Sequence, residues 1–301
     1  MKPSRFQHAA AILAAPYLLA LQSCSTPIAP STSTTQESPA QTTSIATAAV
    51  SSEAVSADPL WSTQFSADAW QGEWNMSSDR AWGEENLQRV TSGESPFPTF
   101  LRVRYPAGSA SPSVSRKDNV PIGGAQFYAD LGIPSQESMR LSYHLRFSPN
   151  FDFVKGGKLP GLYGGEGGSG GNIPDGRDGF STRFMWRADG DGELYAYLPT
   201  SRRHGTSIGR GNWRFQPGVW HHLEQQIDLN QPGVADGRVR VWLDDQLVLD
   251  QSGLIFRSVE DLKLDGIFFS TFFGGGDASW ATPQDTYVDF ANFSISAPSA
   301  P

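Results

Sequence analysis

After Pro59 the chain breaks into short runs in which apolar and polar residues alternate, and Gly, Pro, Asn and Asp separate these runs. In Arg238–Leu243, for example, Val239, Val241 and Leu243 alternate with two arginines and a tryptophan. No segment keeps an apolar stripe at helical spacing over three turns. The pattern therefore predicts an all-β protein whose strands have one buried and one solvated face.

Nine segments are clear strand candidates. They are Phe100–Tyr105, Met139–Phe147, Phe180–Arg187, Glu193–Leu198, Trp220–Leu229, Arg238–Leu243, Gln246–Asp250, Gly266–Phe273 and Tyr287–Ile295. Asp244 and Asp245 separate two of these segments and predict a tight hairpin. Since sheets with one apolar face pack against each other, we expect a β-jelly-roll sandwich of two antiparallel sheets, with the functional site on the concave face.

The N-terminal residues have the pattern of an export signal. Lys2 and Arg5 precede the apolar run Ala9–Leu21, which is too short to predict a membrane-spanning helix. Leu21-Gln22-Ser23-Cys24 is similar to a lipobox, in which the cysteine is acylated and becomes the mature N-terminus. The alternative is ordinary signal cleavage that leaves an unpaired cysteine.

Three regions follow from this composition: a signal peptide over residues 1–24, a linker over 25–58 and one folded domain over 59–301. The linker is rich in Ser, Thr, Ala and Pro and nearly free of large apolar residues, which predicts disorder. We expect an exported protein, either held at the cell envelope by a lipid on Cys24 or secreted. The lipid would be its only contact with a membrane, and the fold is expected to be monomeric.

The charge is uneven along the chain. The formal net charge of -8 becomes -10 when the signal is removed, because Lys2 and Arg5 are lost, and an acidic protein argues against nucleic acid as a partner. Between Arg140 and Arg214, however, eleven Lys or Arg face seven Asp or Glu, a local charge of +4. A basic region on an acidic protein suits an anionic ligand.

Two neighbouring segments direct reactive side chains to one face. In Phe180–Arg187, alternation sends every second residue to the core and the others to the opposite face. That opposite face carries Ser181, Arg183, Met185 and Arg187. Tyr195 and Tyr197 alternate with apolar residues in the next segment, so a hairpin would bring both phenols beside Ser181 and Arg183.

A guanidinium and two phenols suit the β-elimination of a 4-linked uronate. The C5 hydrogen is weakly acidic, so a cation must neutralise the adjacent carboxylate and stabilise the developing enolate. Arg183 matches a carboxylate in shape and charge. Tyrosine would act as general base and acid, with its pKa lowered by Arg183 or by Lys158, which we expect a preceding loop to bring to this face. This chemistry requires no cofactor, and no Cys/His spacing indicates a metal site.

Several motifs together resemble polysaccharide lyase family 14, and the likeness covers most of residues 60–297. They are the run Lys155-x-x-Lys158-Leu-Pro-Gly-Leu-x-Gly-Gly, the Ser-x-Arg and Tyr-x-Tyr segments, and Phe272-Phe273-Gly274-Gly275 with Trp280. The resemblance implies a β-jelly-roll lyase of alginate or glucuronate chains. It also implies the essential residues Lys158, Ser181, Arg183, Tyr195 and Tyr197, although Lys155 could exchange roles with Lys158.

Other candidate substrate-binding residues have a structural alternative. Arg187 would bind a second uronate or form a salt bridge to Asp189 or Asp191. Gln126 would donate a hydrogen bond to a carboxylate or cap the end of a strand. Lys155, three residues before Lys158, would bind substrate if it does not replace that residue.

Three other functions fit the sequence less well. A glycoside hydrolase needs two carboxylic acids at a controlled separation, and the acidic residues near the candidate site fall in a turn. A non-catalytic module that binds acidic polysaccharide is the main alternative. It would keep the aromatic and basic residues, but it does not explain two phenols beside a lysine and an arginine. A structural lipoprotein of the cell envelope would explain only the N-terminal signal.

Overall fold

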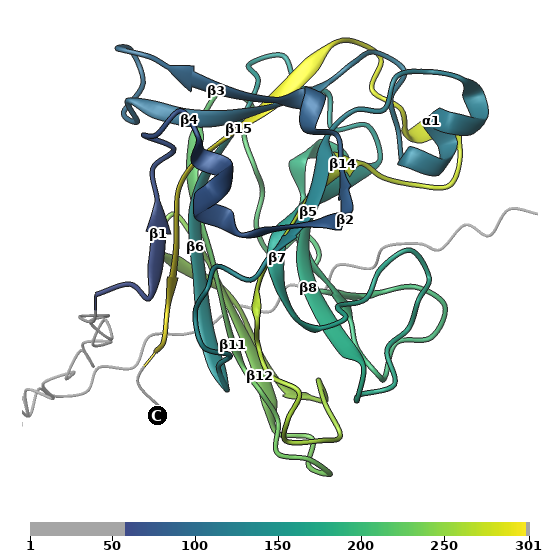
Figure 1. The fold of residues 1–301 in the computed structure, drawn as a ribbon. Helices are drawn as coiled ribbons and strands as arrows, with labels where there is room; N and C mark the ends of the chain where they lie inside the picture. The colour runs from purple at the N-terminus through teal and green to yellow at the C-terminus, as the bar shows by residue number, and fades with distance from the viewer. Residues whose placement is uncertain (1–57, 299–301) are drawn as a thin grey trace, which may run out of the picture. The chain divides into compact units, whose positions relative to one another are not determined.

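The computed structural model describes residues 58–298, except for the side chains of Ser78 and Asp79. Two antiparallel sheets face each other (Figure 1). The eight-stranded sheet contains, in spatial order, β13 (Gln246–Leu254), β12 (Gly237–Leu243), β11 (Trp220–Asp228), β6 (Ser138–Phe147), β15 (Thr286–Ser296), β4 (Thr99–Tyr105) and β3 (Leu87–Thr91), with β1 (Trp61–Thr63) also paired to β15. The predicted sandwich of two antiparallel sheets is confirmed.

The seven-stranded sheet carries the candidate site. Its spatial order is β10 (Thr206–Ile208), β9 (Gly192–Tyr197), β8 (Gly179–Arg187), β7 (Gly156–Gly165), β14 (Gly266–Phe273), β5 (Ala125–Ala129) and β2 (Met76–Trp82). The described helices are short: α1 (Pro112–Asp118) and the 3-10 turns η1 (Trp70–Trp74), η2 (Glu84–Asn86), η3 (Ala188–Gly190) and η4 (Ala278–Trp280). Within residues 58–298, none of them has the length and apolar character that a membrane crossing requires.

All nine predicted strands are confirmed, with ends that differ by one residue in most cases and by four residues in β13. The predicted hairpin between β12 and β13 also forms. Asp244 and Asp245 both have positive φ values, 50° and 64°, as a two-residue turn that follows the twist of its strands requires. The calls on residues 1–57, including the signal peptide, the acylation of Cys24 and the linker, lie outside the described residues and stay predictions.

The position of Lys158 corrects one expectation. We expected a loop to bring it to the site, but it lies on β7 (Gly156–Gly165), although glycines and a proline surround it. Pro160 cannot donate to a sheet ladder, and the pairing of β7 with β8 shifts register between Leu159 and Gly161. Gly157 is required by packing, since a Cβ there would lie 2.1 Å from a ring atom of Trp186. The glycines of this strand therefore permit close approach rather than forming turns.

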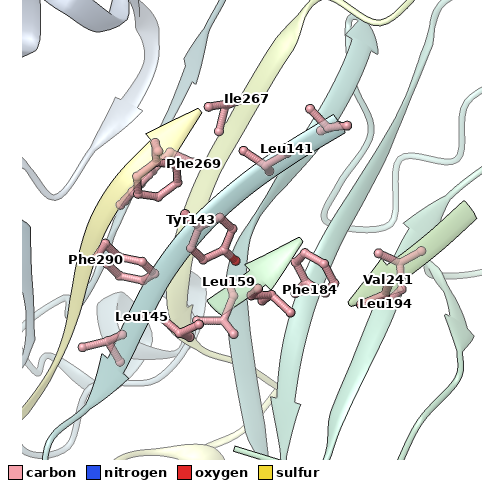
Figure 2. Packing of buried hydrophobic residues seen from close by; sticks show 14 of the residues in the cluster. Leu141, Tyr143, Leu145, Leu159, Phe184, Leu194, Val241, Ile267, Phe269 and Phe290 are labelled. Atoms are coloured by element: carbon pink, nitrogen blue, oxygen red, sulfur yellow. The ribbon is translucent and has the colours of Figure 1, made fainter. Parts of the chain in front are cut away.

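The hydrophobic core fills the space between the sheets (Figure 2). In β6, Leu141, Tyr143 and Leu145 are buried while the residues between them are partly exposed, as the alternation predicts. They meet inward-facing residues of the other sheet, among them Phe184 of β8 (Figure 2). Each such side chain contributes about 1.5–3 kcal/mol when fully buried. Tyr143 also donates a 3.0 Å hydrogen bond to the Pro160 carbonyl and so joins the two sheets at the irregularity in β7.

Candidate active site

The outer face of the seven-stranded sheet brings the five predicted catalytic residues together. On β8 and β9, Ser181 lies opposite Tyr197, and Arg183 lies opposite Tyr195. These pairs share one face of the sheet because directly opposed residues of an antiparallel pair point the same way. Lys158 reaches the same face from β7, where it lies opposite Met185 of β8. The predicted hairpin and the choice of face are both confirmed, whereas the concave curvature of this face stays a prediction.

A row of directly opposed residues crosses five strands of this sheet. It runs from Tyr195 on β9 through Arg183 on β8, Gly161 on β7 and Phe268 on β14 to Tyr128 on β5. Gly161 has no side chain and so leaves a gap in the row. No larger residue fits there, because a Cβ would lie 2.7 Å from the Arg183 Cα. The Arg183 guanidinium extends across that gap and lies 4.5 Å from the centroid of the Phe268 ring.

Around Ser181 and Arg183 this face is buried, which corrects the expectation of a solvated one, whereas Tyr195 is partly exposed. Ser181 is 0% exposed and Arg183 is 2% exposed. The Gly-rich loop 166–178 covers part of the face, since Ser181 donates a 2.6 Å hydrogen bond to the Gly168 carbonyl. The Gly171 N–H donates a 3.1 Å hydrogen bond to the Tyr197 hydroxyl. The cover could not be predicted from alternation, because it comes from a segment outside the strands.

Arg183 is a buried cation with neutral partners. Its Nη1 donates a 3.0 Å hydrogen bond to the Ser270 hydroxyl, which donates in turn to the Gln126 side-chain oxygen at 3.1 Å. Its buried Nε has no hydrogen-bond partner, and no acidic side chain of residues 58–298 forms an ion pair with it. Burial lowers the pKa of Arg183 from its ordinary value. A buried charge without a counter-ion is costly, so this guanidinium is prepared to receive an anionic group.

The Lys158 ammonium is also buried, and its side chain is 9% exposed. Its Nζ lies 2.8 Å from the Met185 sulfur and 3.5 Å from the centroid of the Tyr195 ring. Burial and the nearby Arg183 and Arg187 guanidiniums bring the pKa of Lys158 well below its ordinary value. The amine is therefore more easily deprotonated than an ordinary lysine and can accept a proton.

The two phenols stand edge to face, with the ring centroids of Tyr195 and Tyr197 5.8 Å apart. We expected neighbouring cations to lower the phenol pKa, and for Tyr195 this is wrong. Burial raises the pKa of Tyr195 and outweighs the opposing effect of Arg187 and Arg183. The Tyr195 phenol therefore keeps its proton over a wider pH range than an ordinary tyrosine.

Arg187 lies next to the cluster but has a different acidic partner from those expected. It pairs with Glu193, which is fully buried and also accepts a 2.9 Å hydrogen bond from Ser207. Asp191, one of the expected partners, binds Arg214 instead. The hairpin geometry explains the difference, since β8 and β9 run back beside each other and bring Glu193 of β9 next to the end of β8.

The remaining predicted substrate-binding residues are divided between two places. Gln126 belongs to the site, because it joins Arg183 through Ser270 and lines a pocket of about 390 Å³ beside it. Lys155 is exposed and its ammonium lies 2.5 Å from the Ser279 hydroxyl in η4. Lys158, by contrast, lies beside Met185 and the Tyr195 ring, which favours it over Lys155 as the lysine of the site.

Sequence analysis missed several residues of the site because nothing in their local pattern marks them. Phe268 and Ser270 lie on β14, which is buried along nearly its whole length, while Tyr128 and Arg80 lie on β5 and β2, which were not predicted. Only pairing across the sheet brings them beside Arg183. The register is a property of the whole fold and has no local signature.

One group of described side chains could hold a metal ion, and it lies away from this face. His222 and Glu224 are on β11 of the other sheet, and Asp245 is in the β12–β13 turn. Glu224 already accepts hydrogen bonds of 3.0 and 2.8 Å from Arg140. The Arg140 guanidinium already neutralises the carboxylate that a metal ion would need as a ligand, so we assign no metal to this group.

Comparisons with known proteins agree with this site. The model of the polysaccharide lyase 14 family matches residues 94–293. The PL-14 alginate lyase from Aplysia kurodai is 35% identical, with a TM-score of 0.69, and the match covers 80% of this chain and 100% of that one. A search of curated protein sequences found no match.

Two more distant structures show similarity of fold alone. Alginate lyase vAL-1 from Chlorella virus is 21% identical, with a TM-score of 0.62 and coverage of 75% of this chain and 93% of that one. The endo-β-1,4-glucuronan lyase from Trichoderma reesei is 12% identical, with a TM-score of 0.51 and coverage of 80% and 96%.

Proposed function

Because the chain belongs to polysaccharide lyase family 14 and is a polysaccharide lyase, we propose that it cleaves 4-linked uronate polymers by β-elimination, with alginate as the first substrate to test. The observation that carries this proposal is the buried Arg183 guanidinium, which has no acidic partner in the described part of the chain and lies beside a lysine of lowered pKa and two phenols. The relative from Aplysia kurodai, described as an alginate lyase, supports alginate. β-1,4-Glucuronan is the alternative, since uronates that differ in configuration at C5 or C2 present the same carboxylate.

In the proposed reaction Arg183 binds the carboxylate of the uronate at the cleavage point. Removal of the C5 proton places negative charge on that carboxylate, and a guanidinium held by Ser270 needs little reorganisation to stabilise it. Ser181, two positions before Arg183 on the same face, holds the Gly-rich loop over the site through its hydrogen bond to the Gly168 carbonyl. A planar fork suits this role better than an ammonium, because it binds both carboxylate oxygens.

Lys158 accepts the C5 proton as a neutral amine. The electron pair of the broken C–H bond forms the C4–C5 double bond, and the bond from C4 to its glycosidic oxygen breaks. The Tyr195–Tyr197 pair supplies the proton for that leaving oxygen, and the raised pKa of Tyr195 keeps its phenol protonated. The products are an unsaturated uronate and a new reducing end, and no water is consumed.

The test is the appearance of the unsaturated uronate, followed by its ultraviolet absorbance, with alginate, its mannuronate and guluronate blocks, and glucuronan as substrates. Mass spectrometry of the products identifies the polymer that is cleaved. Tyr195→Phe and Tyr197→Phe form a matched pair that identifies the proton donor, because each removes one hydroxyl and keeps the ring. Binding of these polymers without any unsaturated product would contradict the proposal and favour a non-catalytic module.

A further inference from the structure

A second cationic group lies beside the proposed catalytic cluster. Arg80 of β2 lines the pocket of about 390 Å³ that also contains Gln126 and Tyr128 of β5. Residues of the Gly-rich loop also line this pocket, including Ser169 and Asn172. The volume suits one sugar ring, since pockets for small molecules begin at about 300 Å³. No step of the proposed reaction uses this pocket.

Arg80 and Arg183 lie at the two ends of one aromatic stack. The Arg80 guanidinium is 4.0 Å from the centroid of the Tyr128 ring, and Tyr128 stacks on Phe268 with centroids 4.0 Å apart and an interplanar angle of 12°. The Arg183 guanidinium lies 4.5 Å from the Phe268 centroid. The pocket is therefore joined to the catalytic cluster through this stack and through Gln126, which is hydrogen-bonded to Ser270.

The charge of Arg80 is only weakly compensated. Its Nη1 donates a 2.7 Å hydrogen bond to the Glu166 carbonyl and lies 3.7 Å from the Glu166 carboxylate. The two side chains are 38% and 80% exposed, and exposed ion pairs are weak. The other N–H groups of Arg80 form no hydrogen bond within residues 58–298. A ligand carboxylate can therefore replace that of Glu166 and use the free edge of the guanidinium.

We infer that this pocket is a subsite for a second uronate of the bound chain, and that Arg80 binds its carboxylate. The inference rests on the proposed function, since it assigns Arg80 to the same polyanionic substrate as Arg183. The row of opposed residues leads across the sheet from Tyr195 to Tyr128, and Arg80 lies over the ring that ends it. Arg80 was not among the residues implied by the family motifs, and it lies before residues 94–293, which the family model matches.

The test compares Arg80→Gln with the unchanged protein over uronate oligomers of increasing length. Binding is measured by calorimetry on the full chain in a Lys158→Met background, which removes the proposed base. Affinity should rise when the oligomer becomes long enough to fill the pocket. Arg80→Gln should lose about tenfold in affinity for those longer oligomers and almost nothing for shorter ones. Arg80→Lys, which keeps the charge without the fork, should lose less than Arg80→Gln.

Two further variants separate carboxylate binding from a purely structural role. Glu166→Gln removes the competing carboxylate but keeps the backbone carbonyl, so it should raise affinity for the longer oligomers about twofold to fivefold. Arg104→Gln is the matched control, because Arg104 is an exposed arginine on β4 of the other sheet. It should change neither affinity nor its dependence on length.

Each alternative outcome is decisive. Equal loss at every oligomer length would mean that Arg80 only holds the loop through the Glu166 carbonyl, and unchanged affinity in Arg80→Gln would also overturn the subsite. A wild-type protein that binds uronate oligomers but releases no unsaturated product would contradict the proposed reaction alone. The length dependence would still test Arg80 in that case.

Discussion

Lys158→Met should stabilise the fold while it removes turnover. The Lys158 ammonium has three donors, and within the described chain its only close partners are the Met185 sulfur, a weak acceptor, and the Tyr195 ring. Replacing an incompletely satisfied buried polar group recovers about 1–3 kcal/mol, and methionine has a similar unbranched shape. We therefore expect the free energy of unfolding to rise by about 1–3 kcal/mol. Turnover should fall by about 10²–10⁴, the usual contribution of a general base.

The gain in stability should depend on pH with a defined sign. The ordinary pKa of lysine, 10.5, applies to the unfolded chain, and the pKa of Lys158 in the folded protein lies below it. At pH values between these two pKa values the unfolded chain binds a proton that the folded chain does not. Wild-type stability from this group is complete above pH 10.5 and is lost as the pH falls through the folded pKa. The advantage of Lys158→Met should therefore be larger at pH 7 than at pH 10.

Thermal or urea unfolding at these two pH values measures the effect, and each kcal/mol should raise Tm by roughly 2–4 °C in a domain of this size. Lys155→Met is the matched control, since Lys155 is exposed, and its change in stability should stay within about 0.5 kcal/mol and be independent of pH. A lower Tm in Lys158→Met, or a gain that is equal at both pH values, would show that burial does not disfavour the charged amine.

Three further predictions test the neighbouring contacts. Arg183→Lys keeps a cation but loses the fork, so kcat/KM should fall at least about tenfold while circular dichroism stays unchanged. Arg187→Gln removes a positive charge near Lys158 and leaves Glu193, the partner of Arg187, without its cation. Both effects raise the pKa of Lys158, so the acid limb of the pH–rate profile should move up by roughly 1 pH unit. An unmoved limb would exclude Lys158 as the base. Tyr143→Phe removes the hydrogen bond between the sheets and should lower the free energy of unfolding by about 1–3 kcal/mol in urea titrations, with the same products.

Strands with regular alternation could be predicted from the sequence because their pattern is local. β6 and β12 alternate buried and more exposed residues along their length, as period two requires. The same rule placed Arg183 and both tyrosines on one face before any contact was known. Alternation fixes which residues of one strand share a face, and the short connection between the two segments predicted their pairing, so this part of the site was predictable.

β7 could not be predicted, since Pro160 and five glycines are unusual in a strand. It exists because neighbours on both sides supply hydrogen bonds and because the glycines leave space for Trp186 and Arg183. The identity of the Arg187 partner also depends on the hairpin, which selects Glu193 over closer residues in the chain. Such choices require knowledge of which strands are neighbours.

By itself, therefore, the sequence determined the fold class, most strands and the set of reactive groups, because these follow from residue type and period. The tertiary structure alone decided that the outer face of β8 is covered by loop 166–178, that the pKa of Tyr195 is raised and that of Lys158 is lowered. Solvation controls those pKa values. The solvation of a side chain depends on segments distant in the chain, which local periodicity does not specify.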